Sequence, residues 1–310
     1  MSGKLPFVTG GELNELLPMK AAVDALDAAF AAGPLPDAPL RSRIETGTGD
    51  LLLMPAVGDA GAGVKLVTVN PSNPGRGLPL IHALYALFDP DTLQPVALFD
   101  GGALTGLRTA AVSGLATRYL ARAESRTLVL FGAGVQASAH LEAMRAMRPV
   151  ERVIVVSRTE KRARELAVRA EESDLEAQVA DPGAVAEADL ICTCTTSAEP
   201  LFDGSLVQPG VHVNAVGAFR PADRELDTET VRRGRIVVET REAALAEAGD
   251  LLIPIHEGAI GEEAILADLS QVVRGAQIRR GPEDVTVFKS VGVAFEDLAV
   301  ARAAYERMNR

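Results

Sequence analysis

Two glycines follow a short apolar run near the middle of the chain. The stretch TLVLFGAGVQASAHLEAM, residues 127–144, places Gly132 and Gly134 in a Gly-x-Gly-x-x-Ala pattern that ends at Ala137. After a strand and at the start of a helix, this pattern is typical of a turn that binds the pyrophosphate of a dinucleotide; a tight turn without a ligand is the alternative. The first glycine permits the turn, the second lets the backbone approach the phosphates, and the small alanine allows close helix–strand packing. The predicted phosphate-site residues are Gly132, Ala133, Gly134, Val135 and Gln136.

Three polar residues end the next predicted strand, where the nucleotide ribose is expected. Domains that use NAD usually place Asp or Glu there, to accept a hydrogen bond from the ribose 2′-hydroxyl. This chain has Ser157, Arg158 and Thr159 instead. A guanidinium and two hydroxyls can donate hydrogen bonds to a 2′-phosphate, which a carboxylate would repel. We therefore predict NADP(H) as the preferred cofactor, with NAD(H) as the alternative.

Strands and helices alternate from residue 127 onward. The apolar segments TLVLFG, RVIVVS, EAQVA, DLICTCT, VHVNAVG and RIVVET are separated by helical or loop segments such as EKRARELAVRAEE. This alternation predicts right-handed strand–helix–strand units and a Rossmann-type parallel sheet covered on both faces, and hence an α/β fold. A further helix is expected near 262–274, before the strand VTVFKSVG and a closing helix over FEDLAVARAAYERM.

Residues 1 to about 100 have a different pattern. A helix is expected near 19–32, followed by the segments LRSRIET, DLLLMPAV, GVKLVTV, LPLIHALYALFD and QPVALFD. Pro, Gly, Asn and Asp separate these segments, which predicts a mainly antiparallel sheet with short links. In the segment that follows, five residues recur at three- and four-residue steps and predict one face of a helix: Leu104, Leu107, Ala111, Leu115 and Tyr119.

The composition argues against several classes of partner and site. The net charge of −11 and the pI near 5.0 argue against nucleic acid and anionic membranes as partners. No run approaches the roughly 18 apolar residues of a membrane span, and no signal-peptide pattern opens the chain, so a cytoplasmic location is expected. We expect Cys192 and Cys194 to be unbridged apolar fillers of a buried strand. His140, His212 and His256 fit no metal spacing, so no metal site is predicted.

Eight stretches, in order along nearly the whole chain, together resemble the ornithine cyclodeaminase/μ-crystallin family. They are PLRS (39–42), LLLMPA (51–56), GVKLV (63–67), DGGALTGLRTAAVSGLA (100–116), FGAGVQA (131–137), NAVGAFRPADREL (214–226), GDLLIPIHEGAI (249–260) and TVFKSVG (286–292). The resemblance implies a homodimer. Its substrate-binding and dimerisation domain would comprise residues 1–118 plus 293–310, and its dinucleotide-binding Rossmann domain residues 119–292.

The resemblance also implies the site residues. In the family one Lys and two Arg hold the substrate carboxylate, and the matching positions are Lys65, Arg41 and Arg108, with Arg43 as a rival for Arg41. His82 is a candidate substrate contact; otherwise it is a half-buried strand residue. Further implied cofactor contacts are Arg108, Thr109, Thr195, Val216 and Ser290. Paired hydrogen bonds from guanidinium groups suit a carboxylate, whereas surface cations on a strand and a helix are the alternative.

The departures from the family pattern narrow the expected reaction. Ornithine cyclodeaminases resemble this chain but have acidic residues where it has Leu52 and Phe219, and Lys289 stands where their TVFDS has Asp. We therefore place the chain closer to the ketimine reductase-like branch, which also lacks the second acid. Asp223 and Glu225 are expected to form or cap local structure around Arg220 and Arg224.

The leading hypothesis is an NADPH-dependent reductase of a small cyclic imine (ketimine) carboxylate, such as pyrroline- or piperideine-2-carboxylate. The three cations would anchor the carboxylate, and Lys65 or a water would protonate the imine nitrogen. Because like charges disfavour a preformed iminium, protonation should accompany reduction. The alternatives are an amino-acid dehydrogenase of the alanine type, an ornithine cyclodeaminase, and an NADPH-dependent protein that binds a small ligand without turnover. An amine-handling enzyme should have an acid near the carboxylate pocket.

Overall fold

The computed structural model describes residues 4–33, 41–58 and 61–310. The chain divides into two units, one formed by residues 1–109 with 293–310 and the other by residues 110–292. The first boundary lies inside a helix, earlier than the expected boundary after residue 118. Pro39 and Leu40 of the PLRS stretch lie outside the described residues.

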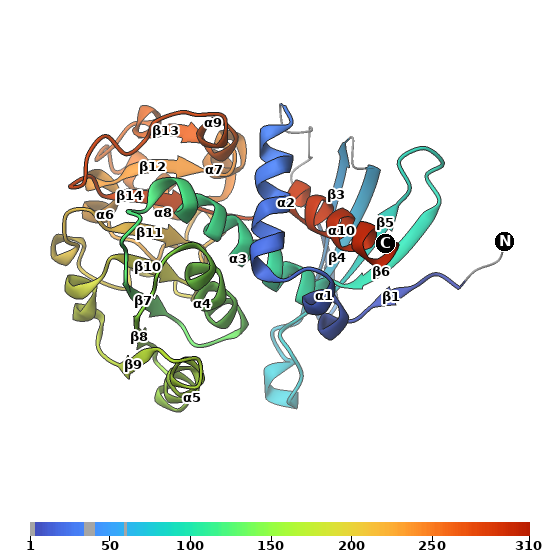
Figure 1. The fold of residues 1–310 in the computed structure, drawn as a ribbon, viewed down its shortest axis with the longest axis horizontal. Coiled ribbons are helices and arrows are strands. Elements are labelled where there is room, and N and C mark those ends of the chain that lie inside the picture. Colours follow the sequence, from blue (N-terminus) through green and yellow to red (C-terminus); the bar gives the residue numbers. More distant parts are fainter. Residues whose placement is uncertain (1–3, 34–40, 59–60) are drawn as a thin grey trace. The chain divides into compact units, whose positions relative to one another are not determined.

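The first unit contains a six-stranded sheet and is mainly antiparallel, as the sequence predicts. Its strand order is β1-β6-β5-β4-β3-β2, and only the short β1 pairs in parallel, with β6. The helices α2 and α10 pack together, and α10 lies along β3 and β4 (Figure 1). The elements are β1 (Phe7–Val8), α1 (Gly10–Leu16), α2 (Met19–Ala31), β2 (Ser42–Thr46), β3 (Gly49–Gly58), β4 (Gly61–Val69), β5 (Ile81–Phe88), β6 (Pro95–Asp100) and α10 (Ala294–Met308).

Alternate residues of this sheet differ in burial. On one face a cross-strand row is formed by Met54, Lys65, Tyr85 and Phe99, all of which are buried. Lys65 therefore lies between apolar and aromatic side chains on the face that α10 covers. The next residues along the strands, such as Val64, point to the opposite face and remain partly exposed although they are apolar.

The second unit contains an eight-stranded sheet in which every strand pair is parallel. The order is β13-β12-β14-β11-β10-β7-β8-β9. Successive residues of the central strands are buried, so both faces of the sheet are covered, as expected for an α/β fold. The strands are β7 (Thr127–Phe131), β8 (Arg152–Val156), β9 (Glu176–Val179), β10 (Leu190–Thr193), β11 (His212–Ala215), β12 (Arg235–Val238), β13 (Ile265–Asp268) and β14 (Thr286–Lys289).

The helices of this unit flank the sheet (Figure 1). They are α4 (Val135–Met147), α5 (Glu160–Glu171), α6 (Thr228–Arg233), α7 (Arg241–Glu247), α8 (Gly249–His256) and α9 (Leu269–Val273). The prediction of a helix near 262–274 is wrong. A short 3-10 helix at Glu262–Ala264 leads into β13, and α9 begins only at Leu269. The β-strand forms because Ile265 and Ala267 pack inward at alternate positions and pair with β12, which outweighs the local helical pattern.

The helix α3 (Gly101–Leu120) begins in the first unit and ends in the second. Arginines satisfy its last carbonyls: Arg148 donates to Thr117 O at 2.6 Å and to Ala121 O at 2.9 Å, and Arg279 donates to Leu120 O at 2.7 Å. Cations at this end also complement the helix dipole. The C-terminal half of α3 is therefore fastened to the second unit by charge-assisted hydrogen bonds.

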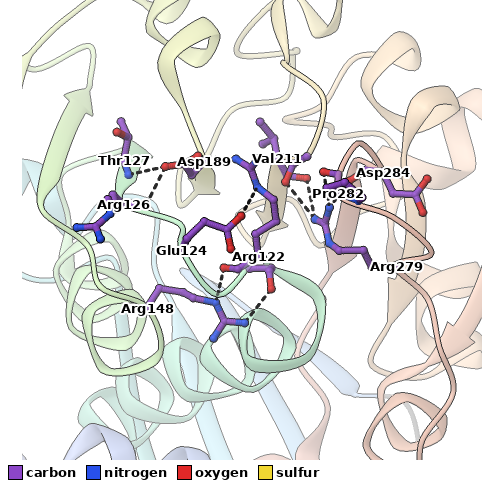
Figure 2. A network of polar contacts seen from close by, with 12 residues as sticks. Arg122, Glu124, Arg126, Thr127, Arg148, Asp189, Val211, Arg279, Pro282 and Asp284 are labelled. Atoms are coloured by element: carbon purple, nitrogen blue, oxygen red, sulfur yellow. Dashed lines mark hydrogen bonds and ion pairs between the residues drawn. The ribbon is translucent and has the colours of Figure 1, made fainter.

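The same region fixes the start of β7. Arg122 donates to Asp189 Oδ1 at 2.6 Å, and Asp189 Oδ2 accepts from the amides of Arg126 and Thr127 at 2.8 and 2.9 Å (Figure 2). This contact positions the strand that leads into the glycine turn. Among the described residues, no helix has the length and apolar character needed to cross a membrane.

Candidate functional site

The glycine turn lies where the order of the parallel sheet reverses. From β7 the chain builds β8 and β9 on one side, then returns to place β10 on the other side of β7. Ligands of open α/β sheets bind at the carboxyl ends of the strands at such a point. Gly132 has φ +104°, and a Cβ built on it would lie 2.6 Å from the carbonyl oxygen of Cys194, which follows β10. Only glycine fits here, so the turn can pass close to the neighbouring loop.

The start of α4 is open to an anion. Gly134 is its N-terminal flanking residue, and within the described part of the chain no side chain caps the helix there. A Cβ built on Gly134 would meet no atom within 4 Å, and Val135 is 75% exposed. Ala137 is fully buried, as predicted for close helix packing. Free amides at the positive end of a 13-residue helix, beside an unobstructed glycine, fit the pyrophosphate of a dinucleotide.

The end of β8 carries no carboxylate. The strand pairs with β7, so its end lies beside the glycine turn at the same edge of the sheet. Ser157 is half-buried and accepts from the amide of Thr159 at 3.3 Å, whereas Arg158 and Thr159 are exposed. The next acid, Glu160, is exposed and pairs with Arg164 one helical turn along α5.

Glu225 joins two loops at this edge, a role that the sequence analysis did not find. It is fully buried, and burial raises the pKa of its carboxyl group. Its oxygens accept from Thr193 Oγ1 and Thr195 Oγ1 at 2.7 Å and from the amides of Thr195 at 2.8 Å and Gly217 at 2.6 Å. The prediction gave Glu225 a structural role around Arg220 and Arg224, and its hydrogen bonds are with Thr193, Thr195 and Gly217 instead. Glu225 ties the loop after β10 to the loop after β11, and these loops carry the predicted contacts Thr195 and Val216.

Two more buried acids hold neighbouring segments. Asp250 accepts from the amides of Glu225 and Leu226 at 2.7 and 2.8 Å and forms an ion pair with Lys289 at 2.7 Å. Glu239 accepts from Ser290 Oγ at 2.7 Å and from the amides of the two residues that follow Ser290. The hydroxyl of Ser290, a predicted cofactor contact, is therefore a donor to a protein carboxylate.

The predicted substrate-binding cations of the first unit form a buried cluster. Lys65 is 2% exposed, and its Nζ lies 2.8 Å from Asp297 Oδ2 and 3.1 Å from Asp297 Oδ1. Arg108, on α3, is also buried, and its Nη1 donates to Glu296 Oε2 at 2.8 Å, while its Nε lies 3.3 Å from Asp297 Oδ1. The long side chains from β4 and α3 thus meet at the start of α10.

Arg41 belongs to the same cluster. It is half-buried just before β2, and its positive charge is one of the causes that lower the pKa of Lys65. The rival Arg43 lies elsewhere: it is exposed and donates to Asp50 Oδ1 at 2.8 Å. The structure therefore brings Arg41, Lys65 and Arg108 together.

Burial changes the acid–base chemistry of Lys65. Desolvation lowers its pKa to about 8, and the charges of Arg108 and Arg41 act in the same direction, whereas Asp297 opposes them. An amine with this pKa can bind and release a proton near neutral pH. The cluster can therefore bind an organic anion and also supply a proton.

The cations of this cluster are paired with two buried acids. Glu296 and Asp297 are fully buried and form ion pairs with Arg108 and Lys65. They lie at other positions than Leu52 and Phe219, where the cyclodeaminases have acids. Leu52 is a half-buried residue of β3, and Phe219 is 40% exposed. The sequence signal for this role was a pair of adjacent acids in the first turn of an alanine-rich helix. Acids in a first helical turn usually complement the helix dipole at the surface, which hides such a role.

Two other predicted contacts have different environments. His82 is exposed on β5, opposite Thr68 of β4. Thr109 is buried next to Arg108 on α3, and among the described residues its Oγ1 has no hydrogen-bond partner.

Cys192 and Cys194 are free thiols, and burial raises the pKa of both.

The comparisons with known proteins agree with these features. The sequence model of the ornithine cyclodeaminase/mu-crystallin family matches residues 7–310. The chain is 43% identical over 263 residues to the Delta(1)-pyrroline-2-carboxylate reductase of Bacillus cereus, with 83% of this chain and 81% of the relative covered. Two solved structures superpose closely. One is the Delta(1)-pyrroline-2-carboxylate reductase of Thermococcus litoralis in complex with NADH and L-proline (TM-score 0.93, 36% identity, 98% of each chain).

The other is an archaeal alanine dehydrogenase dimer with bound NAD (TM-score 0.92, 34% identity, 98% of this chain and 96% of that chain). The family match, the relatives and the shared fold of both units agree with the resemblance expected from eight sequence stretches. This chain belongs to the ornithine cyclodeaminase/mu-crystallin family.

Proposed function

We propose that the protein is an NADPH-dependent reductase of a small cyclic imine carboxylate, with pyrroline-2-carboxylate or piperideine-2-carboxylate as the substrate class. The observation that carries the proposal is the cluster of the buried Lys65 and Arg108 with the half-buried Arg41, in which Lys65 has a pKa of about 8. This cluster combines carboxylate binding with a proton source. The open glycine turn of the second unit supports a dinucleotide as the other reactant.

The relatives support the reaction class. The chain is an oxidoreductase acting on carbon–nitrogen bonds, as are the pyrroline-2-carboxylate reductases and the alanine dehydrogenase that it resembles. The Thermococcus litoralis structure holds L-proline, which is the reduction product of pyrroline-2-carboxylate. Identity of 36–43% to two reductases of that substrate supports the same substrate class here.

Each cation has a role in the proposed reaction. Arg41 and Arg108 hold the substrate carboxylate through guanidinium hydrogen bonds and orient the imine carbon. Lys65 donates a proton to the imine nitrogen as general acid. The reduced nicotinamide supplies the hydride that the imine carbon accepts.

The proposed preference for NADPH rests on the end of β8. Ser157, Arg158 and Thr159 offer donors at the position where NAD-specific domains usually have an acid. The two solved relatives hold NADH and NAD, so NADH is the cofactor to compare. A higher kcat/KM with NADPH than with NADH supports the preference, and the reverse order rejects it.

We also propose that two chains associate through the sheet of the first unit. Its face opposite α10 presents Val64, Leu66 and Leu84, which are apolar and partly exposed. Apolar surfaces of this kind are typical of homodimer interfaces. The archaeal alanine dehydrogenase, which shares this fold, is a dimer. Sedimentation equilibrium of Leu66→Glu beside the unchanged protein tests the interface: dissociation to monomers is expected, and an unchanged mass would reject this face.

The test of the function is a substrate panel. Oxidation of NADPH and NADH is followed with five- and six-membered cyclic imine carboxylates, and the product is identified by mass spectrometry. Formation of the saturated cyclic amino acid is expected. Absence of turnover with every cyclic imine would reject the proposal.

A second candidate is an amino-acid dehydrogenase of the alanine type. The buried acids Glu296 and Asp297 favour it, because an enzyme that handles ammonia needs a carboxylate near the substrate. The relation to the alanine dehydrogenase is also close. Pyruvate with ammonia, assayed beside the imines, separates the two candidates by the ratio of their kcat/KM values.

A further inference from the structure

Asp297 has a special position among the groups around Lys65. Both of its carboxylate oxygens lie within hydrogen-bond distance of Lys65 Nζ, at 2.8 and 3.1 Å. Its Oδ1 also lies 3.3 Å from Arg108 Nε, so one carboxylate bridges two substrate-binding cations. It comes from the first turn of α10, 232 residues from Lys65 along the chain.

The other groups that face Lys65 cannot take its place. Arg108 and Arg41 are cations and repel the ammonium. Glu296 is the neighbouring acid on α10, and its Oε2 accepts a hydrogen bond from Arg108 Nη1 at 2.8 Å. Tyr85, opposite Lys65 on β5, is fully buried, and burial and the charge of Asp297 raise the pKa of its hydroxyl well above its usual range, so it carries no negative charge.

We propose that Asp297 is a positioning residue for the reaction, which keeps Lys65 protonated and aimed until its proton is transferred. This inference rests on the proposed function and assigns a role within it. The contacts support it: Asp297 pairs with Lys65 and lies beside Arg108, and Glu296 pairs with Arg108, so both buried cations have a carboxylate partner. Without these acids, the buried cations would repel one another strongly.

The proton balance follows from this arrangement. The imine carbon gains a hydride and the nitrogen gains a proton, while the reduced nicotinamide of the proposed function becomes oxidised. Lys65 gives up the proton, becomes a neutral amine and takes another from water. Asp297 remains a carboxylate throughout, so it favours the ammonium form before each turnover.

The first test is the pH dependence of kcat in Asp297→Asn. Because Lys65 must be protonated, activity falls on the alkaline side as Lys65 loses its proton. Removing the opposite charge should move this alkaline limb to lower pH by about 1–3 pH units. Titration with NADPH fluorescence should give an unchanged cofactor Kd, because the glycine turn belongs to the other unit. An alkaline limb at the same pH would overturn the proposal.

Glu296→Gln is the matched control. It removes a buried carboxylate of the same helix that contacts Arg108 and leaves the partner of Lys65 in place. It should raise the substrate KM without moving the alkaline limb. Asp297→Glu, which retains the charge, should return the limb toward its original pH. A limb displaced in Glu296→Gln would contradict the proposal even if Asp297→Asn does not fold.

A direct measurement separates this inference from the proposed function. The chain has five lysines, so 13C-labelled lysine gives few NMR signals, and Lys65→Met assigns that of Lys65. The titration midpoint of Lys65 should be lower in Asp297→Asn than in the unchanged protein. Equal midpoints would overturn the role of Asp297 whatever the substrate is. Absence of imine reduction with unequal midpoints would instead reject only the proposed function.

Discussion

Lys289 Nζ lies 2.7 Å from Oδ2 of Asp250, and both side chains are fully buried. Lys289 also donates to the carbonyl of Ala218, and Asp250 accepts from the amides of two residues in the loop after β11. This pair therefore joins the last strand of the parallel sheet to a loop predicted to contact the cofactor.

Lys289→Met should destabilise the protein strongly. It leaves the charge of Asp250 buried without its partner, which typically costs about 3–5 kcal/mol of unfolding free energy. Urea unfolding measures the loss, and adding Asp250→Asn should recover part of it. Arg164→Met removes an exposed ion pair with Glu160 and should cost no more than about 0.5 kcal/mol. Equal losses of unfolding free energy in Lys289→Met and Arg164→Met would show that the buried ion pair stabilises the protein no more than the exposed one.

The two glycines of the turn should respond differently to substitution. Gly132→Ala meets a backbone oxygen at 2.6 Å in a positive-φ conformation, so a lower Tm is expected. Gly134→Asp meets nothing in the protein and caps α4, so the Tm should be kept. Its carboxylate would repel phosphates and should weaken cofactor binding at least about tenfold. Thermal melting and NADPH titration measure both effects; unchanged affinity in Gly134→Asp would place the cofactor elsewhere.

Arg158→Ala tests the cofactor preference. Loss of the guanidinium should lower kcat/KM for NADPH by about 10–100-fold and leave that for NADH nearly unchanged, because only the 2′-phosphate needs the cation. Lys161→Ala, an exposed cation on the adjacent helix α5, is the control for general charge. Equal effects of the two variants, or equal effects on both cofactors, would remove Arg158 from nucleotide recognition.

Lys65→Met should nearly abolish turnover. General acids typically contribute about 10²–10⁴-fold to a rate, and this substitution also removes one carboxylate-binding cation. The NADPH Kd should remain nearly unchanged, since the glycine turn lies in the other unit. Steady-state kinetics and NADPH fluorescence measure the two quantities separately. An unchanged kcat/KM would remove Lys65 from the mechanism.

Two buried histidines should make the protein less stable in acid. Desolvation lowers the pKa of His140 to about 4 and that of His212 to about 3. The unfolded chain binds these protons near pH 6.5, whereas the folded chain does not, so stability decreases as pH falls below about 6.5. Each histidine should contribute a slope of about 1.4 kcal/mol per pH unit between about pH 6 and its folded pKa.

Urea unfolding between pH 4.5 and 7 measures this slope. His140→Gln should reduce the slope of unfolding free energy against pH by the contribution of one histidine. It also removes the hydrogen bond between the His140 ring and Ser113. A slope that His140→Gln does not alter would mean that the buried histidine is protonated in the folded protein.

Much of the fold was predictable because it depends on local patterns. The alternation of short apolar strands with helices predicted the parallel sheet, and the Gly-x-Gly-x-x-Ala pattern predicted the turn at Gly132, where φ and a neighbouring carbonyl require glycine. The predicted helix over 262–274 was wrong because the pairing of β13 with β12 outweighs the helical pattern of this segment. Propensity is a weak guide where long-range pairing decides the conformation.

The sequence by itself determined the fold class, the glycine turn, the absence of an acid after β8 and, through resemblance, the cations Arg41, Lys65 and Arg108. Only the tertiary structure decided what those cations contact. Asp297 forms an ion pair with Lys65 because α10 packs against the face of the sheet to which Lys65 of β4 points. Glu225 joins two loops because the neighbouring strands β10 and β11 end side by side. Burial and charge pairing between residues far apart in the chain have no local sequence signal, because they arise only when distant elements pack together.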